Sequence, residues 1–165
     1  MKQKNLVIFS GIPGSGKSTW AKAHLTDDIA WISRDEVRFA LLDEDEDYFA
    51  HETEVFEKFV EQINQNLKAG KRVFADATHI NWASRRKLLE RIKDKQDTNI
   101  DVYVFRTSLG TCLERNKRRA GRSCVPEKII RRMSVQMTDP MHDSFKYNTV
   151  KYIFDGGKEV IFPHG

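Results

Sequence analysis

Residues 11–19 constrain this chain more than any other segment. They read Gly-Ile-Pro-Gly-Ser-Gly-Lys-Ser-Thr and fit the pattern G-x-x-x-x-G-K-[ST]. The apolar run Leu6–Phe9 just before them predicts a buried strand, and a helix is expected to begin near Lys17. In this order, a strand, a glycine-rich loop and a helix give the pattern the context of a phosphate-binding loop, or P-loop.

Each position of this loop has its own task in holding phosphate. Glycines permit backbone conformations and close approaches that a Cβ would obstruct, so successive N–H groups can converge on phosphate oxygens at a helix N-terminus. Lys17 is expected to reach the β- and γ-phosphates and Ser18 to bind Mg²⁺, so ATP and Mg²⁺ are the predicted cofactors. The predicted nucleotide-binding residues are Gly11, Pro13, Gly14, Ser15, Gly16, Lys17, Ser18 and Thr19.

Strand and helix patterns alternate along the rest of the chain. Short apolar runs predict strands at residues 5–10, 30–33, 72–75, 100–105 and 150–154, with a hairpin return at 159–162. Helices are expected to begin near residues 17, 34, 81, 108 and 126, with Ser33 and Asn81 as caps and Pro126 as a first helical residue. A long amphipathic helix is expected at 56–67, with Gly70 as its C-terminal cap. We therefore expect an α/β P-loop NTPase fold, with a parallel sheet of about five strands flanked by helices and the ligand site at their carboxyl ends.

Composition and charge narrow the class of protein. With 165 residues and 39% hydrophobic content, the chain is expected to form one domain, residues 1–165. Leu6–Phe9 is far too short for a secretory or membrane segment, so we expect a cytoplasmic protein without membrane contact. The formal charge of the chain is +4, and many of its basic residues lie at 115–132. We predict that this segment belongs to an arginine-rich helical lid spanning about 115–137.

The acidic run Asp43–Asp47 is expected to be solvated surface, and both cysteines are expected to be unreactive thiols.

The remaining motifs favour a kinase over a GTPase. A GTPase needs an N-K-x-D segment to read guanine, whereas Asn116-Lys117 is followed by two arginines. A compact chain with an arginine-rich lid fits a kinase of the nucleoside monophosphate kinase type. Such an enzyme needs a base near the acceptor hydroxyl.

Asp35 is the predicted catalytic base. It follows the second predicted strand in Ser33-x-Asp35-Glu36-x-Arg38, and Arg38 shares its helix face. Arg38 could hold an acceptor phosphate bidentately, while the alternative is that Asp35 only complements the helix dipole and pairs with Arg38 at the surface.

Asp76 is the second acidic candidate. It ends the apolar strand at 72–75, the place of a Walker-B-type aspartate, so Ser18 and Asp76 are the predicted metal ligands. The alternative is that Asp76 only caps a turn at the strand end. His79, which has no companion ligands in the sequence, is expected to be a polar surface residue.

Several motifs together resemble the 5′-kinase module of polynucleotide kinase phosphatases and the wider group of small AAA-type P-loop kinases. The resemblance covers about residues 6–137 and rests on G-x-P-G-S-G-K-S-T-W at 11–20, R-D-x-x-R at 34–38, D-x-T at 76–78, and Arg115-Asn116 leading to Val125-Pro126. It implies that Asp35 is the general base, that Arg38 contacts the phosphate beside the acceptor 5′-hydroxyl, and that Asp76 is an orienting acid. A lid arginine would stabilise the transferring phosphoryl group.

The chain departs from the resembled family in two places. The lid is one residue longer than the family pattern, so Arg119 and Arg122 compete for the catalytic role. Asp155 is followed by Gly156-Gly157 instead of the D-x-D-x-T of the phosphatase domain, so no phosphatase half is expected.

Together, the motifs and the resemblance predict six catalytic residues: Lys17, Asp35, Arg38, Asp76, Arg119 and Arg122.

Three functions are compatible with these residues. The first is transfer of the ATP γ-phosphoryl group to the 5′-hydroxyl of a nucleic-acid end. The second is transfer to a small-molecule acceptor such as a nucleoside, sugar or antibiotic. The third is a nucleotide-binding regulatory ATPase without an acceptor. The sequence does not distinguish DNA from RNA, and it does not indicate an oligomeric state.

Overall fold

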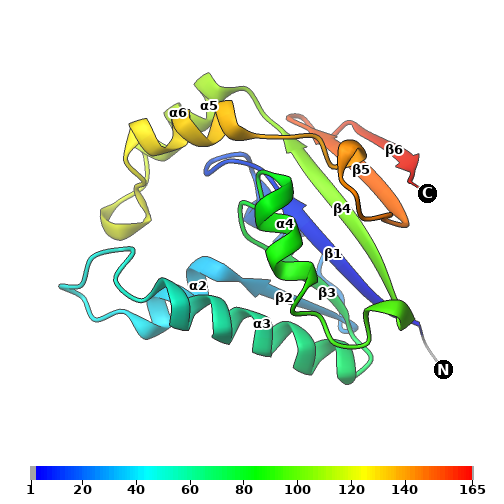
Figure 1. Cartoon of the computed structure of the whole chain (residues 1–165). Coiled ribbons are helices and arrows are strands. Elements are labelled where there is room, and N and C mark those ends of the chain that lie inside the picture. Colours follow the sequence, from blue (N-terminus) through cyan, green and yellow to red (C-terminus); the bar gives the residue numbers. More distant parts are fainter. Residues whose placement is uncertain (1–2, 165) are drawn as a thin grey trace.

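The parallel pairing of five strands organises the fold. The computed structural model describes residues 3–164, except for the side chain of Arg122. The sheet has the order β2-β3-β1-β4-β5-β6, in which β6 alone runs antiparallel to its neighbour (Figure 1). The strands are β1 (Lys4–Ser10), β2 (Ile29–Ser33), β3 (Arg72–Asp76), β4 (Thr98–Arg106), β5 (Thr149–Phe154) and β6 (Glu159–Pro163). The predicted α/β fold is confirmed: the five expected strands pair in parallel, and β6, at the predicted hairpin return, brings the sheet to six strands.

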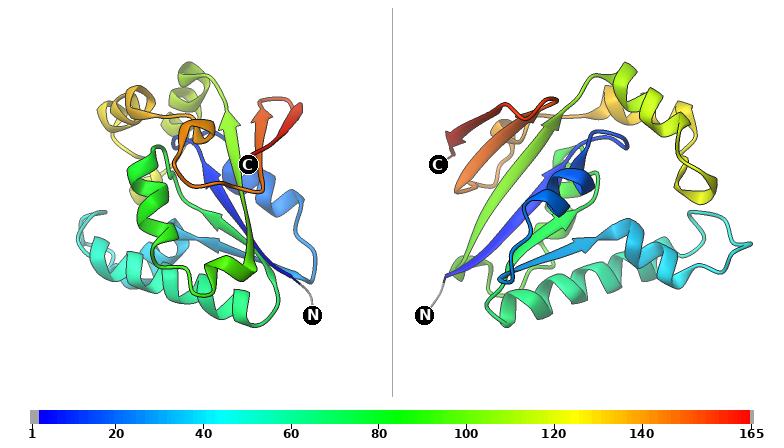
Figure 2. Two further views of the ribbon diagram at one scale, coloured as in Figure 1. Left: turned by 45° about the vertical axis from the view of Figure 1, so that its right-hand side comes forward. Right: turned by 180° about the vertical axis from the view of Figure 1, so that it is seen from behind.

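Helices lie on both faces of the sheet. The long helix α3 and the helix α4 cover one face, and α1 lies on the other (Figure 2). At the carboxyl edge of the sheet, α5 and α6 pack against each other. The helices are α1 (Lys17–Ala23), α2 (Arg34–Leu41), α3 (Glu52–Lys68), α4 (Trp82–Leu89), α5 (Leu109–Lys117) and α6 (Glu127–Gln136).

Residues at most of the helix ends occupy the capping positions that the sequence predicted. The Ser33 hydroxyl accepts a hydrogen bond from the backbone N–H of Glu36 (3.3 Å) and so starts α2. Asn81 caps α4 in the same way, through the backbone N–H of Ser84 (2.9 Å). Gly70 follows α3 with a φ of +81°, a left-handed conformation that favours glycine. Pro126 is the N-cap of α6 instead of its first helical residue.

The predicted setting of His79 is wrong. It was expected at the surface, but it is buried just past β3, where its Nδ1 lies 2.8 Å from the Phe9 carbonyl oxygen. Burial lowers the pKa of the imidazole to about 3, so the ring is neutral at physiological pH. Its backbone carbonyl accepts hydrogen bonds from Ser10 and Arg85, which makes His79 part of the core beneath the site.

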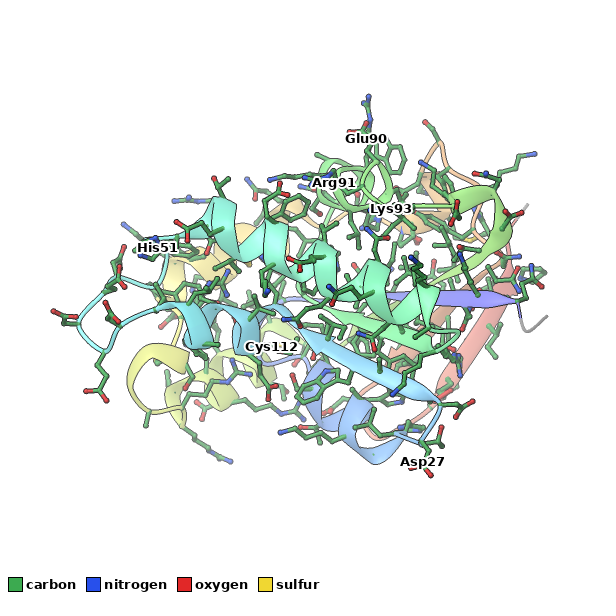
Figure 3. The ribbon with its side chains drawn as sticks, turned by 90° about the horizontal axis from the view of Figure 1, so that it is seen from below. Asp27, His51, Glu90, Arg91, Lys93 and Cys112 are labelled. Carbon is green, nitrogen blue, oxygen red and sulfur yellow. The ribbon has the colours of Figure 1, made fainter. Side chains whose placement is uncertain are left out.

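The acidic run and the cysteines have the settings expected for them, as far as the described residues show. Residues 43–47 are mostly exposed, and His51 closes this loop at the start of α3 (Figure 3). Cys112 is buried, Cys124 is exposed, and both are free thiols. Within residues 3–164, we find no helix with the length and apolar character needed to span a membrane.

A buried ion pair joins α4 to the segment before β5. The Arg85 guanidinium, with a fully buried side chain, donates to both carboxylate oxygens of Asp143 at 2.7 and 2.9 Å. It also donates to the carbonyl oxygens of His79 and Thr138. Tyr147 donates its hydroxyl to Asp143 at 2.6 Å. Because every member is hydrogen-bonded, removing one would leave a buried charge without its partner.

We predict that Arg85→Ala lowers the free energy of unfolding by about 3–5 kcal/mol, the usual cost of breaking a buried pair. The neighbouring residue supplies the control, since Arg86 forms an exposed pair with Glu90 on the same helix. Arg86→Ala should cost less than about 1 kcal/mol. Urea denaturation of both variants measures the difference, and equal losses would contradict a structural role for the Arg85 pair.

Candidate functional site

The P-loop connects β1 to α1 and turns its polar groups inward. Lys17, the first residue of α1, donates from Nζ to the carbonyl oxygens of Gly11 (2.9 Å) and Ile12 (3.1 Å). Burial lowers the pKa of its ammonium, and Arg119 adds to this effect, whereas Asp76 and Asp35 oppose it. The predicted nucleotide-binding lysine therefore shares one cavity with two acidic candidates and one lid arginine.

Gly14 shows why this loop requires glycine. Its φ is +85°, and a Cβ at this position would lie 2.6 Å from the backbone carbonyl oxygen of Cys112 in α5. Both the backbone conformation and the close approach to α5 therefore exclude a side chain. Thr107, just before α5, also donates its hydroxyl to the carbonyl oxygen of Ser15 (2.9 Å). The loop is thus held in place by the segment that leads into the lid.

The two predicted metal ligands are in contact. Ser18 donates its hydroxyl to Oδ2 of Asp76 at 2.8 Å, and the Trp31 indole donates to the same oxygen at 2.9 Å. These hydroxyl and carboxylate oxygens suit Mg²⁺, which usually keeps several waters and binds phosphate oxygens with only one or two protein ligands. A pair of this kind fits an ion whose other ligands are phosphate oxygens and water. Within residues 3–164 no group of three or more His, Cys, Asp or Glu side chains that could hold a metal ion occurs.

One cavity of about 230 Å³ brings most of the predicted site residues together. Its walls come from the P-loop, the carboxyl ends of β2 and β3, helix α2 and the lid. The predicted residues that line it are Pro13, Gly14, Gly16, Lys17, Ser18, Thr19, Asp35, Arg38, Asp76 and Arg119. Gly11 and Ser15 lie behind this surface, where the Ser15 hydroxyl is 3.5 Å from the Lys17 ammonium.

Asp35 is held through one of its two carboxylate oxygens. Oδ1 accepts hydrogen bonds from Arg38 and from the Tyr48 hydroxyl (2.5 Å for Tyr48). Among the described residues, Oδ2 has no hydrogen-bond partner, and 49% of the side chain is exposed. Burial and the charge of Asp35 raise the pKa of Tyr48, which keeps the phenol protonated as a donor. The geometry leaves Oδ2 available to a hydroxyl in the cavity.

Arg38 is more tightly engaged than its predicted role requires. Its side chain is only 5% exposed, and each of its three guanidinium nitrogens has a partner. Nε and one terminal nitrogen donate to Glu52 at 2.9 and 3.1 Å, while the other terminal nitrogen donates to Asp35 and Tyr48. Neither Glu52 nor Tyr48 was identified from the sequence, because no local motif connects them with residues 34–38.

The lid approaches the cavity through Arg119. Figure 1 shows that the segment after α5 faces the loop that follows α2. Asn116 joins the ends of this segment, because its amide donates to the Val125 carbonyl oxygen (2.7 Å) and accepts from the Val125 N–H (3.0 Å). Arg119 lines the cavity, whereas the side chain of the competing candidate Arg122 lies outside the described residues.

A second hollow adjoins the cavity along the P-loop. It shares Gly14, Gly16, Thr19 and Arg119 with the first and continues past Arg115 to the turn after β5. Arg115 donates to the Gly14 carbonyl oxygen (3.2 Å) and to Asp155 (2.7 Å), and so joins the P-loop to that turn. From the sequence, Arg115 was expected in the basic lid and in the motif that leads to Val125-Pro126, but not in contact with the P-loop.

Comparisons with known proteins bear on the family and the fold of this chain. The profile of a family described as "AAA domain" matches residues 6–140. A chain of the Pnkp1/Rnl/Hen1 RNA repair complex aligns with a TM-score of 0.70 at 22% identity, covering 82% of this chain and 44% of that one. The chain thus spans less than half the length of that protein.

Two further solved structures share the fold over most of both chains. Kti12 from Chaetomium thermophilum, in complex with ADP-AlF3, aligns with a TM-score of 0.65 at 18% identity, covering 91% of this chain and 89% of that one. A gluconokinase from Sinorhizobium meliloti 1021 gives 0.57 at 14% identity, covering 96% and 86%. At these identities the structural likeness shows the fold alone. The family match is what shows that the chain belongs to the AAA-domain family of P-loop proteins, whose fold binds nucleotides.

Proposed function

We propose that the protein is an ATP-dependent, Mg²⁺-requiring phosphotransferase that acts on a hydroxyl group. One observation carries this proposal: a single cavity contains a P-loop with its Ser18–Asp76 pair and a carboxylate, Asp35, with one oxygen available. An ATPase can also use a carboxylate to orient its attacking water, so the preference for transfer over hydrolysis rests on the resemblance of residues 34–38 to kinase modules.

The reaction assigns one role to each group. The acceptor oxygen attacks the γ-phosphorus of ATP while its proton passes to Oδ2 of Asp35, and the bond to the leaving ADP oxygen breaks. Lys17 binds the β- and γ-phosphates, and Ser18 and Asp76 would hold Mg²⁺, which neutralises charge on those phosphates when bound. Arg119, arriving from the lid, stabilises the charge on the transferring group.

The second hollow fits the nucleoside part of ATP. It opens directly from the P-loop and has apolar surface from Trp20, Phe105 and Ile153, together with the planar guanidinium of Arg115. Such surfaces suit a purine ring, which binds by stacking and apolar contact. In this arrangement the triphosphate lies along the P-loop and its γ-phosphate points toward Asp35.

For the acceptor, we propose first the 5′-hydroxyl of a polynucleotide. The resemblance of residues 34–38 and of the lid to 5′-kinase modules supports this choice, as does the concentration of basic residues at 115–132. A small-molecule hydroxyl is the second candidate. It is favoured by Arg38, whose three nitrogens are all engaged within the protein and so offer no free fork to an acceptor phosphate.

A screen with γ-labelled ATP distinguishes these acceptors. Oligonucleotides of DNA and RNA with a 5′-hydroxyl, and a panel of nucleosides, sugars and aminoglycosides, should be tested with and without Mg²⁺. The polynucleotide proposal predicts label on the oligonucleotide ends only when Mg²⁺ is present. Label on a small alcohol alone would favour the second candidate, and no transfer to any acceptor would contradict the phosphotransferase.

We predict that Lys17→Ala and Ser18→Ala each abolish most turnover without unfolding the protein, because both side chains serve phosphate and Mg²⁺. Circular dichroism provides the control for folding. Wild-type activity in a folded Lys17→Ala variant would contradict the assignment of the P-loop as the ATP site.

We predict that Asp35→Asn lowers kcat by about 10²- to 10⁴-fold, the scale of general-base catalysis, and leaves ATP affinity unchanged. Glu36→Gln is the matched control, since Glu36 is the exposed neighbour on the same helix. Kinetic assays and ATP titration measure the two effects. If ATP binding is lost instead, Asp35 belongs to the nucleotide site and the base lies elsewhere.

We predict that Arg119→Ala lowers kcat more than it raises KM for ATP, because the arginine stabilises charge that develops in the transition state. Arg118→Ala, at the C-cap of α5, is the control and should have little effect on kcat. A change in kcat below about twofold for Arg119→Ala, worth only about 0.4 kcal/mol in barrier, would make Arg119 a solvated basic residue.

A further inference from the structure

Glu52 connects two helices at the acceptor side of the cavity. It is the first residue of α3, and its carboxylate accepts hydrogen bonds from two arginines of α2. Arg38 donates to both carboxylate oxygens, and Arg34 donates to Oε2 at 3.2 Å. The loop at residues 42–51 turns the chain back, so that α3 packs against α2. Glu52 at the start of α3 thereby lies next to the two arginines of α2.

The pair with Glu52 determines which edge of Arg38 faces Asp35. A guanidinium is a rigid, planar fork, so fixing Nε and one terminal nitrogen fixes the direction of the other. That remaining nitrogen donates to Oδ1 of Asp35 and to the Tyr48 hydroxyl. The position of the candidate base therefore depends on Glu52 through Arg38.

The charges of this group balance. Two arginines, Arg34 and Arg38, face two carboxylates, Asp35 and Glu52. Without Glu52, the largely buried Arg38 would lose its bidentate partner and would be drawn toward Asp35 or toward solvent. Either movement would change how Oδ2 of Asp35 faces the cavity.

We propose that Glu52 is a positioning residue of the acceptor site, which holds Arg38 so that Arg38 in turn holds Asp35 in its catalytic orientation. The proposal rests on the proposed function of Asp35 as the base. A purely structural brace between α2 and α3 would have a different signature, because its loss would act on stability whether or not Asp35 can accept a proton.

Kinetics of Glu52→Gln test the proposal. The substitution keeps the shape of the side chain and removes its charge, so kcat should fall by about 10- to 100-fold with KM for ATP within about twofold. In the Asp35→Asn background the same substitution should cause almost no further loss, because the group through which Glu52 acts is already disabled.

The matched control is Glu57→Gln on the same helix. Glu57 also forms a two-bond pair with an arginine, Arg91, but that pair lies on the surface. In Figure 3, Arg91 lies beside the middle of α3, away from His51, which precedes Glu52 at the start of that helix. Glu57→Gln should leave kcat unchanged.

Two kinetic outcomes would overturn the proposal. The first is an equal further loss of kcat in the Asp35→Asn background, which would mean that Glu52 acts independently of the base. The second is a gain in activity toward acceptors that carry phosphate beside the hydroxyl, with other acceptors unaffected. Glu52 would then be a filter against acceptor charge and not a positioning residue.

A readout without turnover separates this proposal from the proposed function. In ¹⁵N spectra of the full chain, the Arg38 Nε–H, assigned with Arg38→Lys, should exchange slowly in the wild type and in Glu57→Gln and rapidly in Glu52→Gln. If no acceptor is ever phosphorylated but this difference is observed, the proposed function fails while the hold of Glu52 on Arg38 stands. Slow exchange in Glu52→Gln would show that Glu52 does not hold Arg38 and would overturn the proposal.

Discussion

Parallel pairing of β1 with β3 is the constraint on which the rest of the site depends. The register that aligns Ile8 with Ala75 brings the ends of both strands to the same edge of the sheet. β1 then continues into the P-loop, and β3 ends at Asp76. The bond from Ser18 to Asp76 follows from this alignment, although 58 residues separate the two in sequence. β2, next to β3, presents Arg34 and Asp35 at the same edge.

Two halves of the candidate site meet at that edge. The P-loop half is held in place by α5, which packs against Gly14, and by Thr107, which donates a hydrogen bond to Ser15. The proposed acceptor half depends on polar contacts between α2, α3 and the loop that joins them. Both halves follow the rule that sheets of this class bind ligands at the carboxyl ends of their strands, and the arginine-rich segment between α5 and α6 faces them from the far side.

Local signals in the sequence predicted most of the fold and pointed to the P-loop half of the candidate site. Strand periodicity, the caps at Ser33 and Asn81 and the spacing of the P-loop glycines each act over a few residues, so the sequence exposes them. Glu52, Tyr48 and the Arg115–Asp155 pair were missed because their partners are distant in sequence and only packing brings them together. His79 was misplaced for the same reason, since its burial depends on contacts with β1 and α3.

The central claim is that one cavity transfers the γ-phosphoryl group to a hydroxyl other than water. A single-turnover experiment with γ-labelled ATP and the acceptor found by screening measures how the label divides between the acceptor and inorganic phosphate. The account predicts that the acceptor receives most of the label and that little phosphate forms in its absence. Phosphate release at the same rate with and without acceptor, and no labelled acceptor, would contradict it and identify the protein as an ATPase.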